Sequence, residues 1–133
     1  MYEFHQKVLF KHCDPAGIVF FPRYYEMVND CVEAFFADVL DWPFEAMHQK
    51  GAVPTRAIET EFLAPSRHGD ALVLEMRIVA LGRTSCAYTL TARCDGAPRF
   101  THRATLVNVT ADGRPTAWPT PVAVTLAQWK DLP

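Results

Sequence analysis

The amino-acid sequence predicts an α+β fold in which an antiparallel β-sheet wraps around one long central helix. Residues 22–41 show extended helical periodicity, and the chain after Gly51 consists of strand-like segments separated by turn signals. No second helical segment is long enough to supply the repeated crossovers of a parallel sheet. With 133 residues the chain has the length of one domain, and we expect residues 1–133 to form it.

The N-terminal part is predicted to be a strand followed by an irregular loop. Residues 4–12 show the alternation of a strand with one buried face. Residues 13–22 contain two prolines and one glycine, which exclude regular structure there. The loop therefore leads directly into the long helix.

The long helix is predicted to begin at Pro22 and to end near Asp41, before Pro43. Its apolar residues come in pairs four positions apart and so form one stripe of a helix. Proline is well suited to the first helical position, where its missing N–H costs nothing. A short helix over Phe44–Lys50 is expected to follow, with Gly51 as its C-terminal stop.

The remainder of the chain is predicted to form strands. Turn signals at 66–70, 82–83, 95–96 and 112–113 separate segments with the mixed alternation of antiparallel strands. The proline-containing residues 115–121 are interpreted as an irregular connection to a final short element. The predicted strands are residues 53–65, 70–81, 84–94, 99–110 and 120–126.

Composition excludes several classes of function. The chain has 13 basic and 15 acidic residues, and this net charge of −2 argues against nucleic acid as the main partner. No apolar stretch reaches the ~18 residues that a membrane span needs, and the N-terminus lacks the order of a signal peptide. We therefore expect a cytoplasmic protein with no membrane partner.

The cysteines and histidines predict neither a disulfide nor a metal site. The four cysteines form no C-x-x-C pair, and we interpret them as reduced thiols that pack as small apolar side chains. The five histidines show no spacing typical of metal ligands. We predict no metal and no cofactor.

Asp14 is the candidate catalytic residue. It lies in the constrained loop before the helix, where Gly17 permits a positive φ or close backbone approach. The first N–H groups of a helix are unpaired and can bind a carbonyl oxygen as negative charge develops on it. A carboxylate opposite such donors can catalyse acyl transfer, although an aspartate before a helix can also serve only as a cap.

The segment Asp14–Tyr24, with the sequence DPAGIVFFPRY, resembles the signature of the 4-hydroxybenzoyl-CoA thioesterase family of hotdog proteins. A looser resemblance continues through Pro54–Thr55, Glu61–Pro65 and Gly69–Asp70. The resemblance implies a hotdog fold and hydrolysis of an acyl-CoA thioester, with a hydroxybenzoyl-like aromatic acyl group as one candidate. Coenzyme A would then be part of the substrate rather than a cofactor.

The resemblance also assigns roles to residues. Asp14 matches the catalytic aspartate, acting as nucleophile or as general base on water. The backbone N–H of Phe21 matches the amide that polarises the thioester carbonyl, and Gly17 matches a glycine of the same loop. His12 is expected to point to the same side of a strand as Asp14, and with Tyr24 it is a candidate for contact with substrate.

Coenzyme A recognition is predicted to depend on Arg83. The family has a run of basic residues after its second long strand, and here the segment 81–85 keeps only this arginine, which can hold a phosphate through two hydrogen bonds. Arg67 and Arg103 are candidates to assist. A substrate carried by an acyl carrier protein is therefore an alternative to an acyl-CoA.

Other functions and assemblies also fit the sequence. Glu26 and Glu33 on the long helix are the second choice for the catalytic carboxylate. The alternative functions are a non-catalytic module that binds acyl thioesters, and a hotdog dehydratase or hydratase, although residues 14–22 lack the loop histidine of that chemistry. Because a single hotdog unit leaves sheet edges unpaired, the resemblance implies a homodimer, commonly stacked into a tetramer, with active sites shared between chains.

Overall fold

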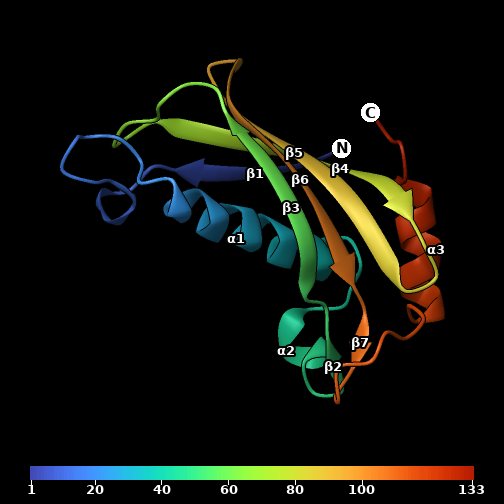
Figure 1. The fold of residues 1–133 in the computed structure, drawn as a ribbon. Coiled ribbons are helices and arrows are strands. Elements are labelled where there is room, and N and C mark those ends of the chain that lie inside the picture. Colours follow the sequence, from blue (N-terminus) through green and yellow to red (C-terminus); the bar gives the residue numbers. More distant parts are fainter.

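The computed structural model describes residues 1–133 as a curved antiparallel sheet with one long helix on its concave side (Figure 1). The five strands lie in the order β1-β4-β5-β6-β3, so that β1 and β3 form the two edges. Helix α1 spans Pro22–Asp38. The sheet strands are β1 (Tyr2–Lys7), β3 (Thr55–Phe62), β4 (Ala71–Leu81), β5 (Ser85–Cys94) and β6 (Ala97–Val107). The predicted α+β arrangement is confirmed.

Five smaller elements complete the fold. A 3-10 turn covers Phe10–His12, and the short helix α2 covers Phe44–Met47. Strands β2 (Gly51–Ala52) and β7 (Val109–Thr110) pair with each other below the main sheet. Helix α3 (Thr120–Trp129) lies beside the end of β4 (Figure 1).

The predicted strand over residues 4–12 is wrong in its second half. Strand β1 ends at Lys7. The N–H of Val8 still donates to the Asp70 carbonyl at 2.8 Å, but the N–H of Asp70 donates to the Arg67 carbonyl, so the strand ladder stops there. The chain then closes into the 3-10 turn, in which the N–H of Leu9 donates to Nδ1 of His12 at 2.9 Å. His12 and Asp14 therefore do not lie on one face of a strand.

The predicted strand over residues 120–126 is also wrong, because this segment is the start of helix α3. Val122 and Leu126 lie four residues apart and are both buried, whereas Val124 between them is exposed. Pro121 occupies the first turn of the helix, where proline is favoured. Packing of one helical face overrides the strand preference of the β-branched residues.

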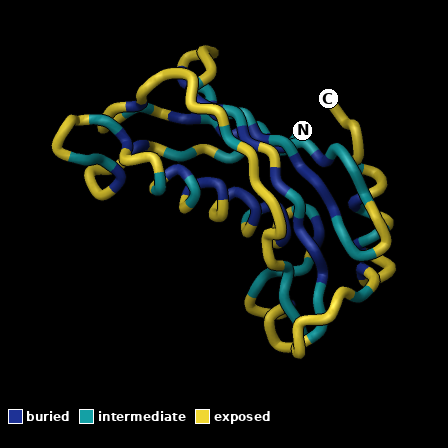
Figure 2. The backbone as a smooth tube through the Cα atoms, viewed as in Figure 1, coloured by how far each residue is buried: buried dark blue, intermediate teal, exposed yellow.

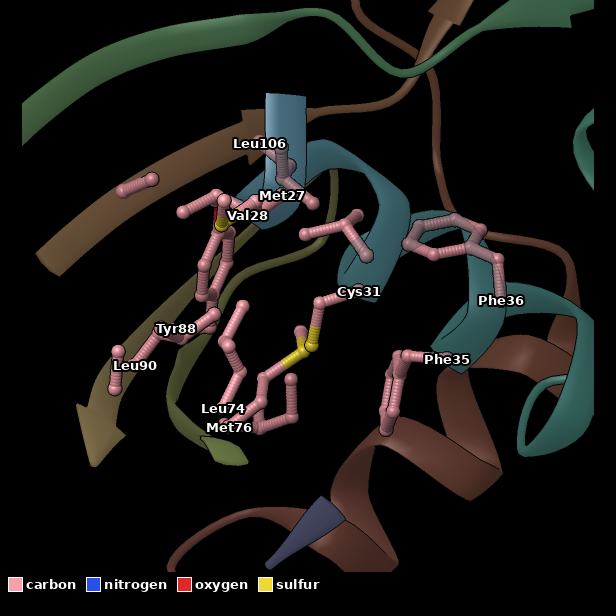
Figure 3. Packing of buried hydrophobic residues seen from close by; sticks show 14 of the residues in the cluster. Met27, Val28, Cys31, Phe35, Phe36, Leu74, Met76, Tyr88, Leu90 and Leu106 are labelled. Carbon is pink, nitrogen blue, oxygen red and sulfur yellow. The ribbon is translucent and has the colours of Figure 1, made fainter. Parts of the chain in front are cut away.

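The core lies between one face of α1 and the concave face of the sheet. Cys31 on the helix points toward Leu74 and Met76 on β4 (Figure 3), and Met27 and Phe35 belong to the same cluster of buried residues. The alternate residues of the central strands are buried, while most of β3 is exposed (Figure 2). The apolar stripe of α1 and the strand alternation together therefore form one core.

The cysteines belong mostly to this core. All four are unpaired, and Cys31, Cys86 and Cys94 are buried. Burial raises the pKa of the Cys31 and Cys86 thiols to about 12, so both are neutral. No three His, Cys, Asp or Glu side chains gather where they could hold a metal ion. None of the helices is long and apolar enough to cross a membrane.

Candidate active site

Asp14 opens a tight turn within the loop between β1 and α1. The N–H of Gly17 donates to the Asp14 carbonyl at 2.9 Å, and the N–H of Asp14 donates to the Ile18 carbonyl at 3.0 Å. Aspartate, proline and glycine occupy the positions that this type of turn favours. Gly17 has a φ of +82°, which L side chains rarely adopt, so the expected positive φ is confirmed.

The two carboxylate oxygens of Asp14 have different environments. Oδ1 accepts the N–H of Ala16 at 2.9 Å and so stabilises the turn. Oδ2 has no hydrogen-bond partner within the chain. Asp14 therefore caps its own turn, as many aspartates do, and still presents one free oxygen.

A pocket of about 530 Å³ opens beside Asp14. Its wall carries two cations, Lys11 and Arg23, together with the ring of Phe20 and the thiol of Cys13. Arg23 is held by Glu26 at 2.7 Å, whereas Lys11 has no ion-pair partner. Asp14 thus borders a partly apolar hollow whose wall also carries two basic residues.

The start of α1 supplies an unpaired backbone donor in the same loop. Phe21 is the N-cap residue, and its N–H has no acceptor within the chain. Its ring is 54% exposed and packs edge-on against Phe20 and Phe62. An unpaired amide at the positive end of a helix can bind an oxygen that carries negative charge.

His12 and Tyr24 do not line this pocket. His12 is only 3% exposed, and its Nδ1 accepts the Leu9 N–H; burial, reinforced by the nearby Lys11, lowers the pKa of its ring. Tyr24 is 4% exposed and packs its ring 4.6 Å from that of Phe100. Of the predicted site residues, Asp14 lines the pocket, Gly17 and Phe21 belong to the same loop, and the side chains of His12 and Tyr24 are buried in the interior.

A second cavity, of about 540 Å³, lies between α1, α2 and the start of β3. Most of its lining is apolar, and the residues from both sides include Val28, Val32, Met47, Val53, Pro54 and Ile58. Pro54 and Thr55, where the looser family resemblance continues, both line it. A mostly apolar hollow of this volume is typical of a small-molecule site.

A chain of hydrogen-bonded neutral side chains borders this second cavity, and three of its members line the cavity. The Tyr25 hydroxyl donates to Thr60 at 3.2 Å, and the Thr60 hydroxyl lies 2.8 Å from Nδ1 of His102. The Tyr88 hydroxyl is 3.5 Å from the other ring nitrogen. Burial lowers the pKa of His102, so the ring is neutral at pH 7.

The sequence prediction missed this chain of polar groups. A signal existed, since Phe100, His102, Ala104 and Leu106 alternate along β6 and are all buried. A histidine in an apolar alternation marks a polar group inside the sheet, which needs hydrogen-bond partners.

Arg83 lies far from Asp14 within one chain. It is exposed in the turn between β4 and β5, whereas the loop of Asp14 lies beyond the opposite end of β4 (Figure 1). Strand β4 has 11 residues and so spans ~36 Å. Within one chain, Arg83 and Asp14 therefore lie towards opposite ends of the sheet.

The other arginines divide between two places. Arg67 lies beside the Asp14 loop, since its backbone pairs with Ile18 and its guanidinium is 4.0 Å from the position of a Cβ on Gly17. Arg103 lines a mostly polar groove with Glu59, over strands β3, β5 and β6. Glu26 and Glu33 are exposed on α1, and neither lines the pocket of Asp14 or the second cavity.

Comparison with known proteins identifies the family. The model of the thioesterase-like superfamily matches residues 8–127, so the chain belongs to this superfamily. A comparison with curated proteins found no match. The matched range includes the Asp14 loop, helix α1 and every strand of the sheet except β1.

Solved structures of thioesterases share the fold. The 1,4-dihydroxy-2-naphthoyl-CoA thioesterase from Synechocystis is similar over 99% of this chain and 98% of its own, with 16% identity and a TM-score of 0.89. A gentisyl-coenzyme A thioesterase is similar over 91% and 98%, with 24% identity and a TM-score of 0.84.

A Staphylococcus aureus protein in complex with CoA is similar over 96% of this chain and 82% of its own, with 16% identity and a TM-score of 0.88. At these identities the likeness establishes the fold alone. The predicted hotdog fold and the resemblance to thioesterases are thereby confirmed.

Proposed function

We propose that this protein is an acyl-CoA thioesterase in which Asp14 is the catalytic carboxylate and the Phe21 amide polarises the thioester carbonyl. The observation that carries the proposal is the unpaired Phe21 N–H at the start of α1, in the same loop as the free oxygen of Asp14. A donor without a partner is ready for the oxygen that becomes negative in the transition state.

The chemistry follows one of two routes. As a nucleophile, the Asp14 oxygen attacks the carbonyl carbon, the C–S bond breaks, and water then hydrolyses the mixed anhydride. As a general base, Asp14 takes a proton from the water that attacks the carbonyl, and the proton is passed to the leaving thiolate. Both routes yield the free acid and CoA.

The second cavity is proposed to receive the acyl group. Its apolar lining suits a ring, and its neutral Tyr25–Thr60–His102 chain suits an uncharged hydrogen-bonding substituent rather than a carboxylate. The dihydroxynaphthoyl and gentisyl groups in the names of two similar structures support an aromatic acyl group.

Coenzyme A is proposed to bind across two chains. Strand β3 is an unpaired edge with exposed apolar side chains at Ile58 and Phe62, and a second copy of the chain would cover it. Arg83 of one chain would then meet the nucleotide phosphates of a thioester bound at Asp14 of its partner. The structure with CoA in the S. aureus protein supports a CoA ligand. Two such dimers would form the tetramer.

The test is thiol release from a panel of aromatic and aliphatic acyl-CoAs, comparing the wild type with Asp14→Asn. We expect turnover to fall by roughly a thousandfold with the fold intact. Asp30→Asn is the matched control, because Asp30 is an exposed carboxylate of α1 that makes no ion pair.

The other outcomes would overturn the proposal in different ways. Turnover that survives Asp14→Asn would move the catalytic role to Glu26 or Glu33. Absence of turnover on the panel and on acyl-carrier-protein thioesters, with binding retained, would favour the non-catalytic module. Hydration of an enoyl-CoA by the wild type would favour the hydratase.

A further inference from the structure

Arg99 on β6 connects the sheet to the segment 63–70, which links β3 to β4. Its side chain is 19% exposed, and Nη1 lies 2.9 Å from the Pro65 carbonyl, 3.1 Å from Oγ of Ser66 and 2.8 Å from Oδ2 of Asp70. The Arg99 carbonyl also accepts the N–H groups of Leu63 and Ala64. One residue therefore holds both ends of this segment.

The segment 63–70 in turn holds both ends of the loop that carries Asp14. The N–H of Val19 donates to the Ser66 carbonyl at 2.9 Å. At the other end, Val8 donates to the Asp70 carbonyl and accepts from Gly69, each at 2.8 Å. No other segment of the chain makes backbone hydrogen bonds to both ends of residues 8–20.

Asp70 connects the contacts that Arg99 makes with those that the segment 63–70 makes to the Asp14 loop. Its Oδ2 accepts from the Arg99 guanidinium and from the Arg67 N–H at 2.9 Å, so it closes the turn that presents Ser66 and Gly69 to the loop. These two hydrogen bonds keep the pKa of Asp70 below its usual value. The carboxylate is therefore ionised, and the ion pair intact, at neutral pH.

None of these groups lines the pocket of Asp14. We infer that Arg99 is a positioning residue, which fixes Asp14 and the Phe21 amide relative to each other by holding the segment 63–70 against both ends of their loop. The inference rests on the proposed function for its catalytic part. Small displacements of a reacting group lower the rate of reaction by large factors. Loss of the Arg99 contacts should therefore lower kcat more than it weakens substrate binding.

The experiment compares Arg99→Met with Arg93→Met. Arg93 is the matched control. Its Nε forms a 2.8 Å ion pair with Glu75 within the same sheet, and its side chain makes no hydrogen bond or ion pair with residues 8–20 or 63–70. We expect Arg99→Met to lower kcat by roughly ten- to a hundredfold with KM within about twofold. Arg93→Met should leave both constants within about twofold.

The same substitution made in an Asp14→Asn variant separates a positioning role of Arg99 from a general loss of stability. In Asp14→Asn, the change Arg99→Met should lower the residual rate by less than about twofold, because both changes act on one step. An equal fold-loss in both backgrounds would overturn the inference.

Hydrogen–deuterium exchange gives a readout that does not depend on activity. Arg99→Met should speed exchange in peptides from residues 8–20 and leave peptides from β4 unchanged, and Arg93→Met should change neither. Unchanged exchange in residues 8–20 would overturn the inference that Arg99 keeps this loop in place. If the wild type has no thioesterase activity, the proposed function and the catalytic part of the inference fail together, while exchange still decides whether Arg99 holds the loop.

Discussion

The Thr60 hydroxyl lies 2.8 Å from Nδ1 of His102, and it also accepts the proton of the Tyr25 hydroxyl. A hydroxyl has one proton and two lone pairs, so Thr60 can either donate to a bare Nδ1 or accept from an Nδ1–H, and it satisfies either neutral tautomer of the ring. A second proton would place a positive charge inside the sheet, and burial therefore keeps His102 neutral.

Stability is expected to fall below pH 6.5. Burial lowers the pKa of His102 from its ordinary value of 6.5, so the unfolded chain takes up a proton at a pH where the folded chain does not. The free energy of unfolding should decline from pH 6.5 down to the lowered pKa, by at most about 1.4 kcal/mol per pH unit for this group. His12, whose pKa is lowered as well, contributes in the same direction.

Denaturant unfolding at a series of pH values would check this expectation. His102→Gln should flatten the decline between pH 6.5 and the lowered pKa without abolishing it, since His12 remains. His5→Gln serves as a control, because His5 is exposed on β1. A decline that is equally steep in His102→Gln and wild type would contradict the assignment.

Removal of the Phe21 N–H should impair catalysis, while removal of the ring should not. Phe21 has a φ of −53°, close to the value that proline imposes, and its N–H makes no hydrogen bond in the chain. Phe21→Pro is expected to lower kcat by roughly a hundred- to a thousandfold. Phe21→Ala should keep kcat within about threefold, since the amide remains. Equal losses in the two variants, each with an unchanged melting temperature, would argue against the amide.

Chains with complementary defects should restore activity when mixed. Arg83 and Asp14 lie beyond opposite ends of β4, so a shared site needs Arg83 from one chain and Asp14 from the other. Co-expression of Asp14→Asn with Arg83→Ala would give hybrid dimers with one intact site. Random pairing should then recover about a quarter of wild-type activity. Activity no higher than that of the separate variants would mean that the two residues do not share a site across chains.

Tyr24→Phe should stabilise the protein. The Tyr24 hydroxyl is buried without a hydrogen-bond partner, and burial raises the pKa of this group. Removing an unpaired buried hydroxyl is expected to raise the free energy of unfolding by about 1 kcal/mol. KM for acyl-CoA should stay within about twofold, because the ring lies in the core. A marked rise in KM would instead support the prediction from the sequence that Tyr24 contacts substrate.

The sequence predicted α1 and the central strands well, because burial imposes a clear period on them. Phe35 and Phe36 continue the apolar stripe to the last turn of the helix. The helix ends three residues earlier than predicted, since Asp41 adopts a φ of +49° and the chain turns there before Pro43. Helix α3 was missed because its valines alternate like those of a strand, and only Pro121 indicates a helix start.

The candidate site was predicted only in part. The motif placed Asp14, Gly17 and the Phe21 amide in one loop, since all three are close in sequence. The role of Arg99 and the cavity near His102 depend on contacts between segments tens of residues apart. Such contacts follow from strand register, which local patterns do not specify.

The two hollows lie on separate stretches of the chain. Asp14 and its pocket belong to residues 11–23, whereas α2 and residues 52–55 close the second cavity. If the proposed function holds, the residues that cleave the thioester bond and the residues that select the acyl group therefore lie in different segments of the sequence. A duplicated gene could acquire a new substrate through substitutions in α2 alone while its hydrolytic chemistry stayed unchanged. An engineer could randomise the same short stretch and keep every variant's catalytic loop intact.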